Sequence, residues 1–499
     1  MASIAELFAK GLELNASTLL TVLLATVLLL ALQSALAQRK RADEGKPLRR
    51  KMSNIGASTL LSETDTNLSI PVSLLSVEGK VSVEEFTARL QERMQDDDFF
   101  RRFRSLVVGH ERTFIELPEF DASRNVVGHV LREDETPISY LESLVNKPLD
   151  FTKPLWEMHV IHDKNNDDVT HFAWRLHHCL GDGQSLAVAL VRFSDNKEQF
   201  DKMIEKMQAA KKNEKKTPKP LSAKLKDFVG FLFICVWSSY VITRKLYVLL
   251  FRTEPQTIFK RPGGTQKKLS YNMLYSVAET KRVGKQFNAT VNDVMLSCVA
   301  GAMRKSLEAT GVTVSPKLTV RAAIPVDMRG TNEVVKDARN KFSSLVIDFP
   351  VGIADQQKRL KIIRANMGEA KNSLEKFFTY WSGHIVAQLP NWLVGSIIQF
   401  TTSRISVAIS NVRGAAFSLS ICDKPLKGFY GFVPPPPTVN LGVAVLSVGD
   451  ELGLNVLVDP AVGVDGAQFL QYAKEEFDAL KVIADTQQTE TPKEEKKQQ

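Results

Sequence analysis

The chain has 499 residues, of which 44% are hydrophobic and 24% are charged, a balance typical of a globular enzyme rather than of a disordered, collagen-like or disulfide-stapled chain. A chain of this length usually forms two or three domains. Lysine and arginine exceed aspartate and glutamate by 65 to 56, and this net charge of +9 by itself suggests an acidic partner such as nucleic acid.

Most of the excess positive charge lies in three short segments, residues 39–51, 202–226 and 244–268. Together they carry a net charge of +18, so the remainder of the chain is net acidic. Because each segment adjoins an apolar run, an anionic membrane surface is favoured over nucleic acid as the partner of these basic residues. The 4 cysteines include no CxxC pair, which argues against a disulfide framework and against a zinc site.

The first apolar run, residues 16–37, contains 22 residues without a charge and is long enough to span a hydrocarbon core of about 30 Å. We therefore expect a membrane anchor over residues 1–38 and a basic linker over residues 39–68. The sequence Ala35-Leu36-Ala37 also resembles a signal-peptidase site, so cleavage is the alternative. The basic residues after the run place the following chain in the cytosol.

Residues 69–197 have the pattern of a mixed α/β domain. Phe86, Leu90 and Met94 are spaced four apart and predict an amphipathic helix over residues 83–94. The elements predicted after this helix are two alternating strands and a helix that follows a glycine turn, at residues 154–161, 169–178 and 186–193.

A basic crossover linker is expected over residues 198–270, because residues 195–221 are charged and interrupted by prolines. Within the linker, residues 228–251 form an aromatic-rich apolar run that is broken by two basic residues. The uninterrupted part is short for a transmembrane span, so an interfacial helix is predicted.

A second α/β domain is expected over residues 271–485, with a helix at residues 291–307. Its predicted strands are residues 318–324, 343–349, 406–409, 439–448 and 453–458. A polar tail, residues 486–499, ends in Lys496-Lys497-Gln498-Gln499, which has the form of a dilysine retrieval signal of the endoplasmic reticulum.

The candidate chemistry is concentrated in the sequence His177-His178-Cys179-Leu180-Gly181-Asp182-Gly183. If the preceding strand alternates up to its end, His178 points into the interior and His177 points away. A buried, neutral histidine is suited to act as a general base. Asp182, between two glycines, is expected to orient the turn through a hydrogen bond or an arginine pair, or to cap the next helix.

Other interpretations of these residues are weaker. The pattern alone fits a core histidine without a catalytic function as well as it fits a general base at His178. A metal site built from His171, His177 and Asp182 lacks further ligands at suitable spacing, so we expect no metal. Cys179 fails as a nucleophile because it would face away from His178, and Ser185 lacks a nucleophile-elbow motif.

The HHxxxDG pattern at residues 177–183 is that of the coenzyme-A-dependent acyltransferase superfamily. Further segments match in order: PLWEMHVI, NDVMLSCVAGAMR, AAIPVDMRG, NKFSSLVIDFP and SNVRGA. As a set they resemble the wax ester synthase/diacylglycerol acyltransferase family, in particular its eukaryotic membrane-associated members. The resemblance implies two chloramphenicol-acetyltransferase-like domains in a mixed α/β fold, each a mixed sheet with flanking helices, with a tunnel between them.

The resemblance also implies site roles. His178 is the expected base, supported by His177 and Asp182, and Asn292 is the expected donor near the thioester. The residues expected to contact substrate are Gly183, Pro154, Leu155, Trp156, Asp293, Ser410 and Asn411. Each of these roles has a structural alternative. Asp293 can simply cap its helix, and Ser410 and Asn411 can belong to a plain turn. Pro154 to Trp156 can simply pack in the core.

The expected function is transfer of a fatty acyl group from acyl-CoA, a co-substrate and not a resident cofactor, to a fatty alcohol or diacylglycerol without an acyl-enzyme. Because His178 and Asn292 must reach one tunnel, the run between them cannot cross the bilayer once. The expected place is the endoplasmic reticulum membrane, with the catalytic body in the cytosol and no nucleic-acid partner. A condensation-type enzyme and a catalytically silent lipid-binding protein are the alternatives.

Overall fold

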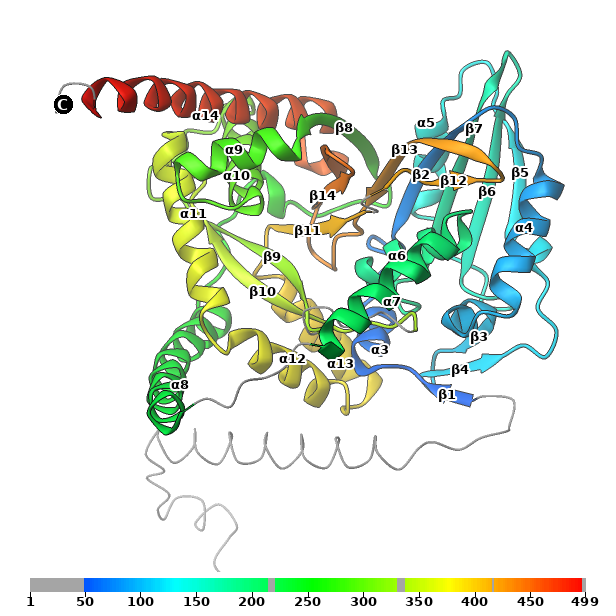
Figure 1. Cartoon of the computed structure of the whole chain (residues 1–499), viewed down its shortest axis with the longest axis horizontal. Coiled ribbons are helices and arrows are strands. Elements are labelled where there is room, and N and C mark those ends of the chain that lie inside the picture. The colour runs from blue at the N-terminus through cyan, green and yellow to red at the C-terminus, as the bar shows by residue number, and fades with distance from the viewer. Residues whose placement is uncertain (1–48, 214–219, 330–336, 415–416, 496–499) are drawn as a thin grey trace, which may run out of the picture.

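The computed structural model describes residues 49–213, 220–329, 337–414 and 417–495 (Figure 1). The expected anchor at residues 16–37 and the dilysine tetrapeptide lie outside the described residues. Two six-stranded mixed sheets organise the fold, and most buried hydrophobic side chains form one cluster on each sheet. This agrees with the expected mixed α/β fold class.

The first sheet carries the HHxxxDG segment at the end of one of its inner strands. In spatial order its strands are β12 (Ser420–Ile421), β13 (Lys424–Phe432), β2 (Val72–Glu78), β7 (Asn166–Leu176), β6 (Trp156–Asp163) and β5 (Val126–Val130). All neighbours are antiparallel except β5 and β6. α4 (Val83–Gln95) covers this sheet and buries Phe86, Leu90 and Met94, which confirms the predicted helix.

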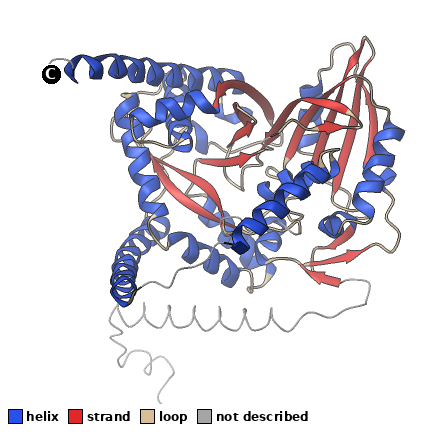
Figure 2. Ribbon diagram, in the orientation of Figure 1, coloured by secondary structure: helices blue, strands red, loops and turns tan. Residues whose placement is uncertain are grey.

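The second sheet is formed by the later part of the chain. Its strands in spatial order are β10 (Phe342–Phe349), β9 (Val320–Asp327), β11 (Val407–Arg413), β14 (Leu441–Val448), β15 (Glu451–Val458) and β8 (Lys268–Ser276). β11 runs parallel to both of its neighbours. The helices α9 (Val277–Gln286), α10 (Val291–Ala309), α11 (Gln356–Lys371) and α14 (Gly466–Glu495) lie together on the side away from the first sheet (Figures 1 and 2).

Two segments differ from the sequence-based expectation because tertiary contacts determine them. β12 and β13 belong in sequence to the second domain, yet β13 pairs with β2 and extends the first sheet. Residues 49–61, expected as linker, form β1 (Arg49–Lys51) and α3 (Asn54–Leu61). β1 joins β4 (Thr113–Glu116) and β3 (Ser105–Val108) in a three-stranded sheet, and Ala57 and Leu60 of α3 are buried.

The connection between the two sheets is more helical than expected. α6 (Gly183–Phe193) and α7 (Lys197–Asn213) follow the HHxxxDG segment, and α8 extends over Leu221–Phe251 as one continuous helix of 31 residues. The prediction of a linker up to residue 221 was therefore wrong for α7. The remaining short elements are α5 (Pro137–Val145), α12 (Glu375–Val386), α13 (Asn391–Thr402), η1 (Asp98–Arg104), η2 (Ala122–Asn125), η3 (Ile258–Lys260) and η4 (Pro460–Val462).

Candidate active site

The two histidines lie in a turn just beyond β7, which ends at Leu176. The His177 N–H donates to the Leu155 carbonyl over 2.8 Å, the His178 N–H donates to the Ser69 carbonyl over 2.8 Å, and the Leu180 N–H closes the turn onto His177. The expectation that strand alternation would turn His177 outward was wrong. His177 is buried, with 1% of its surface exposed, because the strand has ended, whereas His178 is partly exposed.

His177 supports the turn rather than facing solvent. Its Nδ1 accepts the Cys179 N–H over 3.0 Å, and its Nε2 lies 3.2 Å from a Glu63 carboxylate oxygen. Burial, the largest influence on the pKa of His177, opposes a charge on the ring. The Cys179 N–H can donate only to an unprotonated Nδ1, so the geometry assigns a neutral ring whose Nε2–H faces Glu63.

His178 has the environment of a neutral base. Its Nδ1 is buried and has no hydrogen-bond partner among the described residues, and its ring centroid lies 5.9 Å from that of Phe342. Burial lowers the pKa of His178 below its ordinary value of 6.5. Nδ1 is thus enclosed, whereas the side chain as a whole is partly exposed.

Asp182 holds the turn and begins the next helix, as the sequence predicted. One carboxylate oxygen accepts the Ser185 N–H over 2.9 Å and caps α6. The other accepts Arg329 Nη1 over 3.0 Å and the Lys341 N–H over 2.8 Å. Both oxygens are thus occupied by groups that hold the turn containing His178.

The second half of the chain clamps this turn. Arg329, just beyond β9, also donates to Ser185 Oγ over 3.0 Å and to the Arg339 carbonyl over 2.8 Å. Asn340 Nδ2 donates to the His178 carbonyl over 2.8 Å. Arg329 and Asn340 lie in the family-matching segments AAIPVDMRG and NKFSSLVIDFP, but the sequence pattern predicts no role for either residue. Glu63 lies in the segment that was expected to be a linker. Only the matching motifs could have pointed to Arg329 and Asn340.

Asn292 and Asn411 are brought together at the start of α10. Asn411 Nδ2 donates to Asn292 Oδ1 over 2.9 Å. The amide oxygen of Asn292 is therefore occupied by Asn411, and its Nδ2 is the group that can donate a hydrogen bond. Asp293 and Thr290 form a reciprocal capping box, so capping explains Asp293. Ser410 lies inside β11, paired with Ala444, and not in a turn.

Gly183 brings the two groups of residues close to each other. A Cβ added at Gly183 would lie 3.1 Å from Cγ2 of Val412, the neighbour of Asn411 in β11. The close approach explains a glycine at the start of α6. The HHxxxDG turn and the end of β11 therefore meet at the junction of the two halves.

Pro154, Leu155 and Trp156 are buried at the start of β6. The Trp156 indole N–H donates to the Phe103 carbonyl over 2.8 Å, and Leu155 supplies the carbonyl that holds His177. Their contacts are those of core residues that position the histidine turn. Among the described residues no group of three or more histidine, cysteine, aspartate or glutamate side chains is arranged to hold a metal ion.

Comparisons with known proteins match both halves of the chain to one family. Residues 66–295 match the wax ester synthase/diacylglycerol acyltransferase catalytic domain, and residues 339–481 match the WS/DGAT C-terminal domain. Wax ester synthase/diacylglycerol acyltransferase 1 of Arabidopsis thaliana is 25% identical over 66% of this chain and 73% of its own length. A probable diacylglycerol O-acyltransferase of Mycobacterium tuberculosis is 24% identical over 81% of this chain and 90% of its own length.

Solved structures show the same fold. The wax ester synthase/diacylglycerol acyltransferase of Marinobacter aquaeolei VT8 superimposes with a TM-score of 0.58 at 16% identity, covering 87% of this chain and all of that one. The first condensation domain of the CDA synthetase gives 0.53 at 13% identity, covering 88% and 97%. With both family models matched in order along the sequence, the chain belongs to the wax ester synthase/diacylglycerol acyltransferase family.

Proposed function

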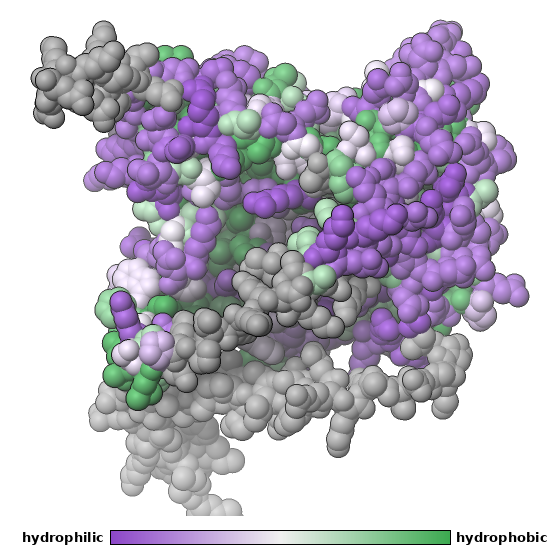
Figure 3. All heavy atoms as spheres, viewed as in Figure 1, coloured by the Kyte–Doolittle hydropathy of each residue, from purple (hydrophilic) through white to green (hydrophobic). Residues whose placement is uncertain are grey.

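We propose that this protein transfers a fatty acyl group from acyl-CoA to the hydroxyl of a long-chain alcohol or a diacylglycerol. The observation that carries the chemistry is His178, a histidine kept neutral by burial in a turn that both halves of the chain clamp. A neutral imidazole can remove the hydroxyl proton as the oxygen attacks the thioester. Figure 3 shows the surface hollowed between the halves, with hydrophobic residues (green) in the hollow, which suits a fatty chain.

Asn292 is the proposed stabiliser of the oxyanion. Its amide is fixed by Asn411, so its Nδ2 is held as a donor before the reaction begins. The tetrahedral intermediate then collapses, the CoA thiolate leaves, and the proton on His178 returns to the thiolate. His177, Asp182 and Arg329 act as positioning residues, and no covalent acyl-enzyme is required.

The test is an acyl-CoA and alcohol assay with His178→Ala. A general base contributes about 10²- to 10⁴-fold, so the variant should lose that much turnover while its melting temperature stays close to that of the wild type. His110→Ala, at a side chain 81% exposed, is the matched control and should keep full activity. Wild-type turnover in His178→Ala would refute the assignment.

We further infer that α8, α12 and α13 dock the enzyme on a membrane. α8 is the one described helix long and apolar enough to cross a bilayer by length and composition. Phe233 of α8 is 74% exposed, and Trp392 of α13 is 71% exposed. In Figure 3 hydrophobic residues (green) gather at the end of α8, at the lower left.

Crossing the bilayer is disfavoured by how α8 is attached. Its later residues bind the catalytic body, since Lys245 Nζ lies 2.6 Å from Glu375 and Ser238 Oγ accepts the Leu374 N–H over 2.9 Å. The active-site turn precedes α8 and Asn292 follows it, so α8 is proposed to lie in the interface. The proposed location is the endoplasmic reticulum membrane, with this body facing the cytosol.

Flotation with phosphatidylcholine vesicles tests the docking surface, with all proteins lacking residues 1–38 so that the expected anchor does not itself bind the vesicles. Phe233→Glu with Trp392→Glu should weaken vesicle binding by about tenfold or more, because each aromatic contributes about 1.5–3 kcal/mol when buried in lipid. Val482→Glu, at an exposed residue of α14, is the control and should bind as the wild type does. Equal binding by all three proteins would refute the docking role.

A further inference from the structure

Arg112, in the turn between β3 and β4, links the first half of the chain to the corner between α12 and α13. Its Nε donates to Asn391 Oδ1 over 2.9 Å, its Nη2 donates to the Leu389 carbonyl over 2.8 Å, and its Nη1 donates to the Ala387 carbonyl. Ala387 is the C-cap of α12, and Asn391 is the first residue of α13. The three nitrogens of one side chain therefore hold the end of one helix and the start of the next.

The backbone of Arg112 has a conformation that favours glycine. Its φ of 54° lies in the left-handed region, which is unfavourable for a residue with a side chain. Its N–H closes the turn onto the Gly109 carbonyl over 3.1 Å, and its carbonyl accepts the Met52 N–H over 2.8 Å. Any residue can make these backbone hydrogen bonds, so the turn by itself gives no reason for an arginine. The contacts with α12 and α13 supply that reason.

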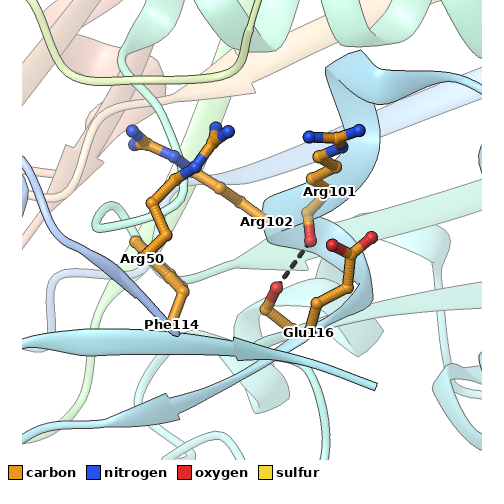
Figure 4. Close-up of a pocket in the computed structure, with 6 residues that line it drawn as sticks. Arg50, Arg101, Arg102, Phe114 and Glu116 are labelled. Atoms are coloured by element: carbon orange, nitrogen blue, oxygen red, sulfur yellow. Dashed lines mark hydrogen bonds between the residues drawn. The ribbon is translucent and has the colours of Figure 1, made fainter. Parts of the chain in front are cut away.

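The small sheet that carries Arg112 is held by the core of the first half. Phe114, two residues further along in β4, is 1% exposed, and its ring centroid lies 5.3 Å from the guanidinium carbon of Arg102 (Figure 4). β4 pairs with both β1 and β3, and Arg50 of β1 is the register partner of Phe114. Arg112 therefore holds the corner against a well-packed part of the molecule.

The corner lies close to the histidine turn, with α3 between them. A Cβ added at Gly395 of α13 would lie 3.1 Å from the Leu61 carbonyl oxygen at the end of α3. A Cβ added at Gly56 of the same helix would lie 3.1 Å from the carbonyl oxygen of Cys179, the neighbour of His178. Figure 1 shows α12, α13 and α3 side by side. One short helix thus contacts both the corner and the turn that carries the proposed base.

The corner also carries part of the proposed membrane surface. Trp392, which is 71% exposed, directly follows Asn391, so the hydrogen bond from Arg112 to Asn391 fixes the helical turn that presents this indole. The other end of α12 is tied to α8 by the ion pair of Lys245 with Glu375. The three docking helices are therefore connected, and Arg112 connects them to the first half.

We propose that Arg112 is a positioning residue that fixes the α12–α13 corner, and with it the entry of a membrane-embedded acceptor, relative to His178. The inference rests on the proposed function, because such an acceptor has to pass from the docking helices to the base. Arg112 is assigned no part in the chemistry. Its loss should therefore impair an acceptor that arrives from the membrane and spare one that arrives from water.

The variants are Arg112→Gly, which removes the guanidinium and suits the left-handed backbone, and Arg112→Lys, which keeps the charge but replaces the planar fork by one nitrogen. The matched control is His110→Ala, in the same turn, at a side chain 81% exposed. Each full-length protein, bound to phosphatidylcholine vesicles, acylates either hexadecanol in those vesicles or 1-butanol in solution. Palmitoyl-CoA is the donor in both assays, and melting temperatures verify that all four proteins are folded.

For Arg112→Gly we expect the KM for hexadecanol to rise about tenfold or more, because losing even one hydrogen bond to a charged group changes an equilibrium by about that factor. The kcat with 1-butanol should stay within about twofold of the wild-type value, and Arg112→Lys should recover part of the loss, as its charge can still reach one acceptor. His110→Ala should behave as the wild type. Unchanged kinetics with both alcohols, or equal losses with both, would overturn the proposal.

Amide hydrogen exchange of residues 384–398 measures the contact of Arg112 with the corner without any acyl transfer. Exchange in this segment should be faster in Arg112→Gly than in the wild type and unchanged in His110→Ala. Unchanged exchange in Arg112→Gly would overturn the positioning role even in an active enzyme. Faster exchange in a protein whose wild type acylates neither alcohol would instead overturn the proposed function and leave the contact with the corner established.

Discussion

The histidine turn at residues 177–182 and the start of α10 at residues 290–293 are both polar ends of buried elements, but they are held differently. The turn depends on residues far away in the sequence, Glu63, Arg329 and Asn340. The start of α10 is held by its own capping box, and only Asn292 reaches a distant partner. The base is therefore positioned by tertiary structure, whereas the proposed oxyanion donor is positioned mainly by local sequence.

After His178→Ala, the largest effect is expected at the start of α10, where Asn292 is proposed to stabilise the oxyanion. Asn292→Ala should lower kcat by about 10²- to 10³-fold, the usual cost of removing one oxyanion donor, and should leave the melting temperature unchanged because the capping box remains. Asn411→Ala should cost less, since it only orients Asn292. Steady-state kinetics with an acyl-CoA and a fatty alcohol check both. A rise in KM with unchanged kcat would place Asn292 in ground-state binding instead.

The same substitution at the two sites tests the comparison directly. Asp182→Asn keeps a capping side chain but removes one of the two carboxylates that pair with the buried Arg329, the other being Asp327, so we expect a loss of about 2 kcal/mol in unfolding free energy and about 10²-fold in activity. Asp293→Asn should cost about 1 kcal/mol or less. Denaturant unfolding and the acyltransferase assay measure these changes. Equal losses would contradict the distinction between distant and local support.

The pH dependence should report the base alone. Because burial lowers the pKa of His178 below 6.5, kcat/KM should be flat above pH 6.5 and fall about tenfold per pH unit below the folded pKa. The unfolded chain binds this proton near pH 6.5 and the native chain does not, so the stability linked to His178 also falls as the pH drops below about 6.5. A midpoint above 6.5 in the pH profile of kcat/KM would be inconsistent with this environment.

The smallest effect is expected at Glu63. Glu63→Gln retains an oxygen that can accept the Ser69 N–H and lie beside His177 Nε2, so activity should fall by only a few fold. Glu63→Leu leaves the Ser69 N–H without its acceptor and His177 Nε2 without its carboxylate neighbour, and should lose distinctly more. Parallel kinetics on the two variants measure the difference. Equal losses would mean that the charge, and not the hydrogen bond, matters at this position.

Much of the architecture followed from periodicity. The helices at residues 83–94 and 291–307 and the strand at residues 343–349 were predicted within two residues of their observed ends, because each has a regular apolar face. β13 was not predicted, since its alternating residues are mostly half-buried and its partner is β2. α7 was missed because about half of its residues are charged, and so charged a segment was interpreted as a linker.

The sequence by itself determined the pattern of strands and helices in two α/β domains, the HHxxxDG motif and the capping chemistry of Asp182 and Asp293, because hydrophobic period and helix caps act over a few residues. Only the tertiary structure decided that His177 is the more buried histidine, that Glu63 supports it, and that Arg329 and Asn340 clamp the turn. These contacts join residues more than a hundred positions apart, and their partners become neighbours only once both sheets have packed.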